Sequence, residues 1–261
     1  IPVTLELGGK DPMIVCEDAN LERAAKGAVW GAFTNSGQVC MSVERLYVDE
    51  SVSETFLEQV IKETKMLKQG TGADDDIGSM TFPGQLNVVR DHVLDAIENG
   101  AVLETGKHPD DWDPESMFLQ PMVLTNVHKE MKIMKEETFG PILPVMTFRD
   151  EAEVVEAANS TEFGLNASVW SSDMDRARRI AGDLVSGAVL INELIISVAN
   201  HHLPFGGAKS SGIGRYHGEN GLRIFCHEKA IMADQGSKGS EIQWYPYQGK
   251  YDTFHTLIQS F

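Results

Sequence analysis

The sequence has few cysteines and few basic residues. Only three cysteines occur among 261 residues, and none forms a Cys-x-x-Cys pair, which disfavours both a disulfide framework and a zinc ribbon. Lys and Arg number 22 against 39 Asp and Glu, for a net charge of −17. Such a charge repels nucleic-acid phosphates and anionic lipid headgroups. We therefore expect a protein of a reducing, cytoplasmic compartment with no nucleic-acid and no membrane partner.

Long apolar runs and a secretory signal are also missing. No run approaches the ~20 apolar residues that span a bilayer, and no charged, apolar and small-residue segment opens the chain. The chain starts Ile1-Pro2-Val3, without a Met and directly in strand-like sequence, so we expect a piece of a larger or processed protein. Apolar residues make up 42%, which excludes a disordered chain and fills one large core or two modest ones.

Strand-like and helix-like patterns alternate along residues 1–235. Short apolar runs between turn residues predict strands, and apolar residues three or four positions apart predict helices. This alternation is typical of an α/β fold, a mostly parallel sheet with helices on both faces, whose loops we expect to meet at the carboxyl edge of the sheet. The predicted strands are 12–16, 45–48, 101–103, 118–127, 142–148, 165–170 and 188–191.

Polar residues and composition mark the expected boundaries. Asp18 is the predicted N-cap of a helix that runs to about Phe33. Ser51 and Glu54 form a capping box that opens a second helix. Residues 236–261 are rich in Gly, Ser, Gln and Tyr without a clear period, so we expect them to form an extension of the preceding domain.

Cys40 differs from the other cysteines because small and polar residues lead up to it. It ends the run Thr34-Asn35-Ser36-Gly37-Gln38-Val39-Cys40, just after a predicted helix. Small residues admit a substrate, and neighbouring backbone N–H groups stabilise a thiolate or an oxyanion, so this pattern is typical of a nucleophile. A buried, inert thiol is the alternative. We expect that alternative for Cys16, inside an apolar strand, and for Cys226, beside Phe225.

Two carboxylates also have suggestive neighbours. Glu6 lies between Leu5 and Leu7, and apolar neighbours raise the pKa of a carboxyl, which suits a general base near neutrality. Glu137 precedes Thr138 and Phe139. A carboxylate can accept hydrogen bonds from both hydroxyls of a ribose, while an aromatic side chain can pack against a flat ring of a ligand. Taken alone, each residue has a plainer explanation. Glu6 could be a solvent-facing residue at a strand edge, and Glu137 could lie at a solvated helix end.

Patterns for other chemistries are missing. The glycine-rich run 206–214 does not follow a strand and open a helix as a dinucleotide fingerprint requires, so it predicts a tight loop. The acidic run 74–76 lacks the ligand spacing of a calcium loop. No His-Glu-x-x-His and no Gly-x-Ser-x-Gly sequence occurs. We therefore expect no metal site.

Five motifs, in order, resemble the NAD(P)-dependent aldehyde dehydrogenase family over residues 3 to about 235. The spacings from Glu6 to Cys40 (40 − 6 = 34) and from Cys40 to Glu137 (137 − 40 = 97) are similar to those of the family. The motifs are Leu5-Glu6-Leu7-Gly8-Gly9-Lys10, Asn35-Ser36-Gly37-Gln38-Val39-Cys40, Glu136-Glu137-Thr138-Phe139-Gly140-Pro141, Phe163-Gly164-Leu165-Asn166 and Pro204-Phe205-Gly206-Gly207-Ala208-Lys209-Ser210-Ser211-Gly212.

The resemblance implies oxidation of an aldehyde to a carboxylic acid with NAD or NADP. It implies that Cys40 is the nucleophile, that its backbone N–H donates to an oxyanion, and that Glu6 activates the water that hydrolyses a thioester. Phe205 is implied as part of an aromatic substrate funnel. The implied cofactor contacts are Glu137, Phe139 and Gly8.

The family's amino-terminal half, with its Rossmann-type cofactor domain and an oxyanion-hole Asn, is missing here. We therefore expect residues 1–235 to be the catalytic domain of a larger enzyme, inactive alone as a dehydrogenase. The alternatives are a cofactor-independent thiol esterase and a non-catalytic remnant. The resemblance also implies a homo-dimer or homo-tetramer. The stretches 42–45 and 192–194, expected near the funnel, resemble semialdehyde-oxidising members.

Overall fold

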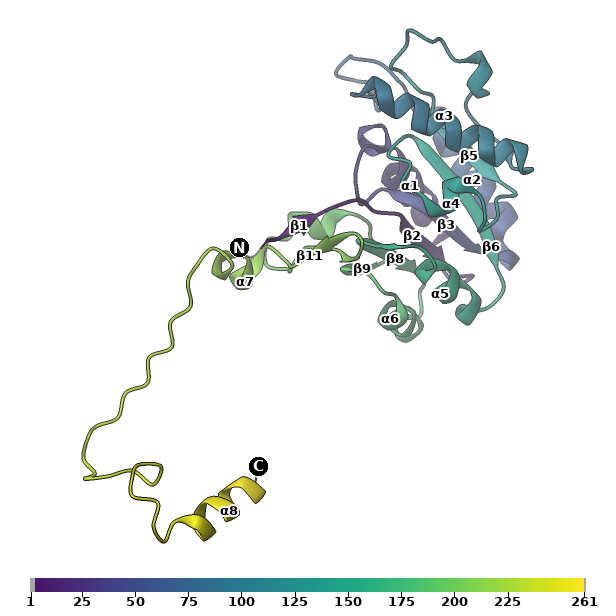
Figure 1. Cartoon of the computed structure of the whole chain (residues 1–261). Coiled ribbons are helices and arrows are strands. Elements are labelled where there is room, and N and C mark those ends of the chain that lie inside the picture. The colour runs from purple at the N-terminus through teal and green to yellow at the C-terminus, as the bar shows by residue number, and fades with distance from the viewer. Residues whose placement is uncertain (1–2, 261) are drawn as a thin grey trace. The chain divides into compact units, whose positions relative to one another are not determined.

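The computed structural model describes residues 3–260 (Figure 1). Contacts divide the chain into two compact units, Ile1–Phe225 and Cys226–Phe261. The second unit contains helix α8 (Tyr251–Gln259). The division falls earlier in the chain than the expected boundary at residue 235, which stays a prediction. Among the described residues, no helix is long and apolar enough to cross a membrane.

The first unit is built on a seven-stranded sheet, counted over the described residues, with the order β4-β5-β6-β3-β2-β8-β9. Neighbouring strands run parallel except for the edge pair β4 and β5. The predicted mostly parallel α/β sheet is thus confirmed. The strands are β2 (Asp11–Val15), β3 (Val43–Asp49), β4 (Val102–Leu103), β5 (Met122–Thr125), β6 (Ile142–Phe148), β8 (Asn166–Trp170) and β9 (Ala188–Ile191).

Helices cover both faces of this sheet because its strands are apolar on both sides. In β2, Met13 and Val15 join one core cluster while Ile14 joins the other, as the alternation of side chains along a strand requires. Helices α1 (Leu21–Phe33) and α2 (Ser53–Met66) pack on the first face. The helices packed on the second face are α3 (Pro83–Glu98), α5 (Glu151–Asn159) and α6 (Met174–Asp183).

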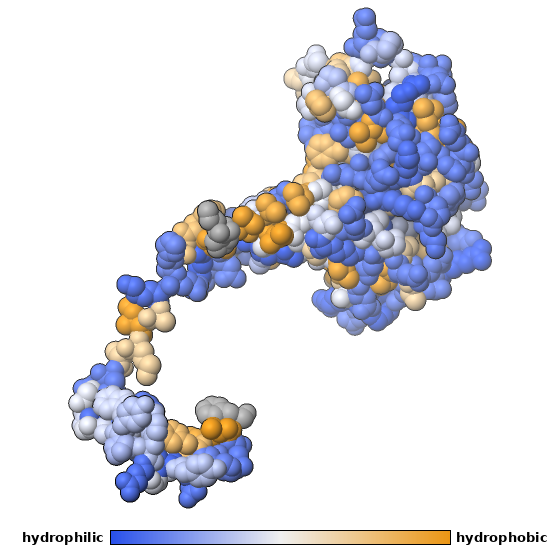
Figure 2. Space-filling view, viewed as in Figure 1, coloured by the Kyte–Doolittle hydropathy of each residue, from blue (hydrophilic) through white to orange (hydrophobic). Residues whose placement is uncertain are grey.

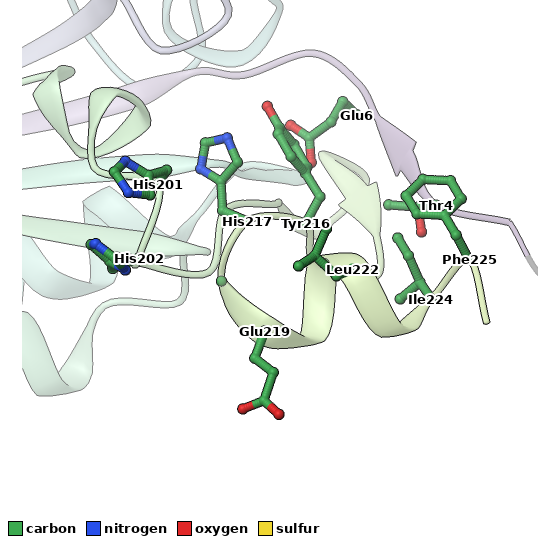
Figure 3. A pocket seen from close by; sticks show the side chains of 12 residues that line it. Thr4, Glu6, His201, His202, Tyr216, His217, Glu219, Leu222, Ile224 and Phe225 are labelled. Carbon is green, nitrogen blue, oxygen red and sulfur yellow. The ribbon is translucent and has the colours of Figure 1, made fainter. Parts of the chain in front are cut away.

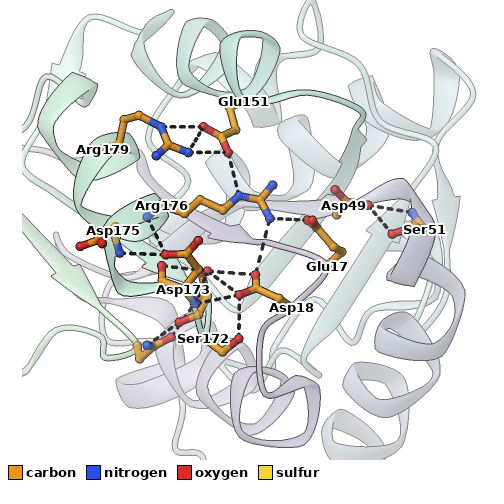
Figure 4. Close-up of polar contacts among 12 residues, drawn as sticks. Glu17, Asp18, Asp49, Ser51, Glu151, Ser172, Asp173, Asp175, Arg176 and Arg179 are labelled. Atoms are coloured by element: carbon orange, nitrogen blue, oxygen red, sulfur yellow. Dashed lines mark hydrogen bonds and ion pairs between the residues drawn. The ribbon is translucent and has the colours of Figure 1, made fainter.

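The N-cap predicted at Asp18 is wrong. Asn20 caps α1, because its side chain accepts a hydrogen bond from the Arg23 N–H. Asp18 instead accepts hydrogen bonds from Ser172 and from the Asp173 N–H in the loop after β8 (Figure 4). Although burial acts to raise it, these hydrogen bonds lower the pKa of Asp18 to about 2. The Asp18 carboxylate is therefore used in tertiary hydrogen bonds and does not cap the helix.

The capping box predicted at Ser51 and Glu54 is also wrong. Asp49 caps a short 3₁₀ turn, Glu50–Val52, by accepting hydrogen bonds from the Ser51 N–H at 2.9 Å and its hydroxyl at 2.6 Å. Helix α2 follows without a side-chain cap. Asp49, at the end of β3, therefore supplies the acceptor in place of Ser51, whose own hydroxyl donates to it.

Two short antiparallel ribbons lie beside the main sheet. Strand β1 (Leu5–Glu6) pairs with β11 (Gly212–Ile213), and β7 (Phe163–Gly164) pairs with β10 (Ala208–Lys209). The first ribbon extends from the sheet toward α7 (Gly218–Arg223). Figure 2 shows apolar side chains along it. The ribbon thus carries Glu6 on an apolar, exposed segment.

We expect Gly37→Ala to destabilise the chain by roughly 2–5 kcal/mol. Gly37 has a positive φ of 70°, and a Cβ there would overlap the carbonyl oxygen of Gly140. The matched control is Gly182→Ala in α6, where a Cβ meets nothing within 4 Å; it should stabilise by about 0.5–1 kcal/mol. Urea unfolding of both variants measures the difference. Equal effects would show that the close approach at Gly37 is not a constraint.

Candidate active site

The site lies where three neighbouring parallel strands begin. Glu6 and the following glycines precede β2, Cys40 precedes β3, and Glu137 precedes β6. These strands are adjacent and parallel, so the segments before them meet at one edge of the sheet. That edge is the amino edge, so the expected placement at the carboxyl edge is wrong. The structure therefore brings Glu6, Cys40 and Glu137 together, at the opposite edge from the one predicted.

The approach to Cys40 has an unusual backbone. Asn35, Ser36 and Gly37 have consecutive positive φ values of 51°, 59° and 70°, the left-handed region that costs energy for residues other than glycine. The loop is held from outside, since Ser36 Oγ donates to the Gly78 carbonyl at 2.8 Å and the Thr81 N–H donates to Gln38 Oε1 at 2.9 Å. Such anchored strain is common at functional sites.

The thiol of Cys40 is half-buried and surrounded by carboxylates. Burial raises its pKa, and the negative charges of Asp11, Glu137 and Glu6 raise it further. A backbone hydrogen bond at Cys40 acts in the expected direction and lowers the pKa, but burial and the nearby negative charges outweigh it. The thiol is protonated at neutral pH, and a base is needed to make it a nucleophile.

Glu6 has a raised pKa, but not for the reason that its neighbours suggested. Leu5 and Leu7 are 38% and 48% exposed, and adjacent residues of a strand point to opposite faces, so they do not enclose the carboxyl. Partial burial raises the pKa of Glu6, while the nearby charges of Arg215 and His217 lower it. The group is thus suited to exchange protons closer to neutrality than an ordinary Glu.

The carboxyl of Glu137 rests against the glycine pair after β1. Its Oε1 accepts a hydrogen bond from the Gly9 N–H at 2.9 Å, and a Cβ on Gly8 would lie 2.5 Å from Oε2. Burial raises the pKa of Glu137. Phe139, two residues on, is half-buried with a φ of 48°. Only a residue without a side chain fits beside this carboxylate. A carboxylate can accept hydrogen bonds from the hydroxyls of a polar ligand such as a ribose.

A buried charged network beside these residues was not predicted. Lys10 Nζ and Glu44 Oε2 form an ion pair at 2.6 Å, with side chains 0% and 4% exposed. Arg45, also buried, donates to the Lys10 carbonyl oxygen at 2.8 Å. Charged residues inside an apolar strand of a sheet covered on both faces are the signal that could have revealed it, because buried charges require partners. The stretch 42–45 is thus buried in the sheet rather than placed at a funnel.

A cavity of about 780 Å³ opens beside Glu6 (Figure 3). Tyr216 and His217 line it, together with Ile224 and Phe225. Phe205 does not line it: the ring is 4% exposed and packs edge-on against Tyr216, with centroids 5.4 Å apart. The predicted funnel residue therefore supports the cavity wall from behind.

The other two cysteines differ from each other. Cys16 is buried, as predicted, and burial raises its pKa to about 12. Cys226 is exposed, so the prediction of a core position is wrong. The apolar neighbour that suggested a core, Phe225, is itself 84% exposed. Within the described part of the chain, no group of three or more His, Cys, Asp or Glu residues could hold a metal ion.

Comparisons with known proteins agree with this fold. The model of the aldehyde dehydrogenase family matches residues 1–231. A 4,4'-diapolycopene aldehyde oxidase from Methylomonas sp is 46% identical over 259 residues, which are 99% of this chain and 48% of that protein. The 4-trimethylaminobutyraldehyde dehydrogenase of Rattus norvegicus is 37% identical over 243 residues, 90% of this chain and 48% of that protein.

Solved structures give the same result. The NAD-dependent aldehyde dehydrogenase from Sinorhizobium meliloti superposes with a TM-score of 0.85 at 35% identity, covering 91% of this chain and 47% of that one. The solved structures that resemble this chain include an NAD-dependent and an NADP-dependent dehydrogenase, so its fold is that of NAD(P)-dependent oxidoreductases. The chain belongs to the aldehyde dehydrogenase family, and it spans about half the length of the curated relatives it matches.

We expect iodoacetamide to alkylate Cys40 about tenfold faster for each unit of pH between about 6.5 and 8. The thiolate is the reacting species, and a pKa raised above that of an ordinary thiol keeps Cys40 on the rising part of its titration over this whole range. Peptide mass mapping at each pH measures the rate.

Exposed Cys226 and buried Cys16 serve as internal controls in that experiment. Cys226 should be labelled early and Cys16 only after unfolding. A Cys40 rate that has levelled off by about pH 9 would mean that its pKa is not raised.

Proposed function

We propose that the protein carrying this chain oxidises an aldehyde to a carboxylic acid with NAD or NADP, and that Cys40 and Glu6 perform the chemistry. The supporting observation is that Glu6 and Glu137 lie close enough to Cys40 for both charges to raise its pKa. A thiol nucleophile and a base within electrostatic reach are what oxidation through a covalent intermediate requires.

Cys40 and Glu6 divide the reaction between them. The Cys40 thiol gives its proton to solvent water, its sulfur attacks the aldehyde carbon, and its backbone N–H donates to the oxyanion of the thiohemiacetal. When bound, NAD or NADP accepts the hydride that leaves this carbon. Glu6 then takes a proton from the water that hydrolyses the thioester on Cys40, a task that its raised pKa suits.

Glu137, Gly8 and Phe139 hold the nicotinamide end of the cofactor in this proposal. The fit rests on the Glu137 carboxylate, which approaches Gly8 so closely that a Cβ there would clash with its Oε2. No dinucleotide fingerprint occurs in the sequence, so the adenosine end must be bound by residues outside this chain. We propose that the chain alone is therefore inactive as a dehydrogenase.

The substrate class follows from the cavity beside Glu6. Apolar side chains, among them Ile224 and Phe225, contribute to its walls, and the relative named for 4,4'-diapolycopene aldehyde matches 99% of this chain. Both observations support an apolar aldehyde. We further propose that the intact protein works in the cytoplasm as a homo-dimer or homo-tetramer.

In the intact protein, Glu6→Gln should lower steady-state turnover by roughly 10²–10⁴-fold, the usual worth of a general base. The first hydride transfer should survive, because hydrolysis is the step that needs Glu6. Rapid-mixing absorbance should then show a burst of NADH or NADPH, and mass spectrometry should find acyl-enzyme on Cys40.

Cys40→Ser is the matched control, since it should abolish both the burst and the turnover. Equal loss of the burst and of turnover in Glu6→Gln would instead assign Glu6 to deprotonation of Cys40. Cofactor-independent hydrolysis of a p-nitrophenyl ester by the wild-type chain, without any NAD reduction by the intact protein, would favour a thiol esterase.

The isolated chain should bind NAD with a dissociation constant no tighter than about 1 mM, or roughly −4 kcal/mol. The physical reason is that Glu137, Gly8 and Phe139 contact only one end of the cofactor. Calorimetric titration measures the constant. Micromolar binding by residues 1–261 would contradict the division of the cofactor site between this chain and another part of the protein.

A further inference from the structure

Thr138, between the two proposed cofactor contacts, is held by all three of its polar groups. Its N–H donates to Glu44 Oε2 at 2.8 Å, its hydroxyl oxygen accepts from Lys10 Nζ at 3.0 Å, and its carbonyl accepts from Gln85 Nε2 at 2.7 Å. The residue is 1% exposed. Because groups from three distant segments hold both its backbone and its side chain, Thr138 leaves its neighbours Glu137 and Phe139 little freedom to move.

Glu44 is the centre of this arrangement. Its Oε1 accepts from the Phe139 N–H at 2.8 Å, while Oε2 accepts from both Thr138 and Lys10. The two bonds to successive N–H groups hold the chain where Phe139 adopts its positive φ of 48°, a conformation that is unfavourable for a residue with a side chain. A single buried carboxylate thus fixes the backbone on which both cofactor contacts depend.

We propose that Glu44 is a positioning residue for the cofactor: it holds the segment 137–139 so that Glu137 and Phe139 can receive the nicotinamide-ribose end. The inference rests on the proposed function for the identity of the cofactor. The hydrogen bonds of Glu44 are independent of that function. Glu44 touches neither substrate nor reacting atoms, because it acts through the backbone of Thr138 and Phe139.

The role requires two accepting oxygens. A carboxylate has two, whereas the amide of glutamine has one acceptor and one donor. In Glu44→Gln either the Phe139 N–H, or the Thr138 N–H together with Lys10, faces a nitrogen that cannot accept. Since side-chain volume hardly changes, the variant tests hydrogen bonding rather than packing.

Hydrogen exchange of the cofactor-free, intact protein provides the first readout. In Glu44→Gln at least one of the Thr138 and Phe139 amides should exchange about 10- to 100-fold faster, as loss of a hydrogen bond to a charged group predicts. The dissociation constant for NAD or NADP, measured by calorimetry, should rise by a similar factor. The rate of Cys40 alkylation should stay within about twofold of wild type, since the thiol makes no bond to this network.

The double variant Lys10→Met/Glu44→Gln separates two explanations. If the single variant acts only by leaving the Lys10 ammonium unpaired, removal of that charge restores slow exchange and tight binding, and the proposal is wrong. If the lost acceptor is the cause, the double variant keeps both defects. Glu98→Gln, an exposed Glu of α3, is the control and should match wild type.

Three further results would overturn the proposal. They are unchanged exchange at Thr138 and Phe139, faster exchange spread evenly over β2 and β3, and faster local exchange with unchanged cofactor affinity. The exchange measurement needs no cofactor. A wild-type protein that binds neither NAD nor NADP would therefore overturn the proposed function, and that result is distinguishable from a failure of the Glu44 arrangement.

Discussion

The buried ion pair between Lys10 and Glu44 connects the three strands on which the site depends. Lys10 directly precedes β2, Glu44 lies at the start of β3, and both bind Thr138 ahead of β6. Burying two charges costs several kcal/mol per ion, and only close geometry with further hydrogen bonds offsets it. An apolar pair of similar size could be as stable. The value of this pair therefore lies in the register it imposes on the strand starts.

The order of the motifs and strands along the chain explains why the site is at the amino edge of the sheet. Ligands of open α/β sheets commonly bind at the carboxyl ends of strands, and the prediction from sequence followed that rule. The evidence against it was already present in the order of motifs and predicted strands. Glu6 precedes strand 12–16, Cys40 precedes 45–48, and Glu137 precedes 142–148. Segments that precede parallel strands can only meet at the amino edge.

The sequence predicted the elements better than their ends and their partners. Strands β6 and β9 have the expected bounds. Each is a continuous apolar run flanked by turn residues, and such a pattern can be recognised in the sequence without knowledge of the tertiary contacts. The N-cap at Asp18 was missed because residues of a distant loop compete for that carboxylate. The role of Glu44 could not be predicted either, since its partners are backbone groups 94 and 95 residues away in the chain. Local patterns carry no information about such contacts.

The charge around Cys40 follows from the same arrangement. Bringing three strand starts together places Asp11, Glu137 and Glu6 around one thiol, and all three raise its pKa. A thiol kept protonated reacts slowly with oxidants and alkylating reagents. A positive charge placed beside Glu137 acts in the opposite direction and lowers the pKa of Cys40. A cationic ligand group held beside Glu137 would therefore also favour the thiolate form of Cys40.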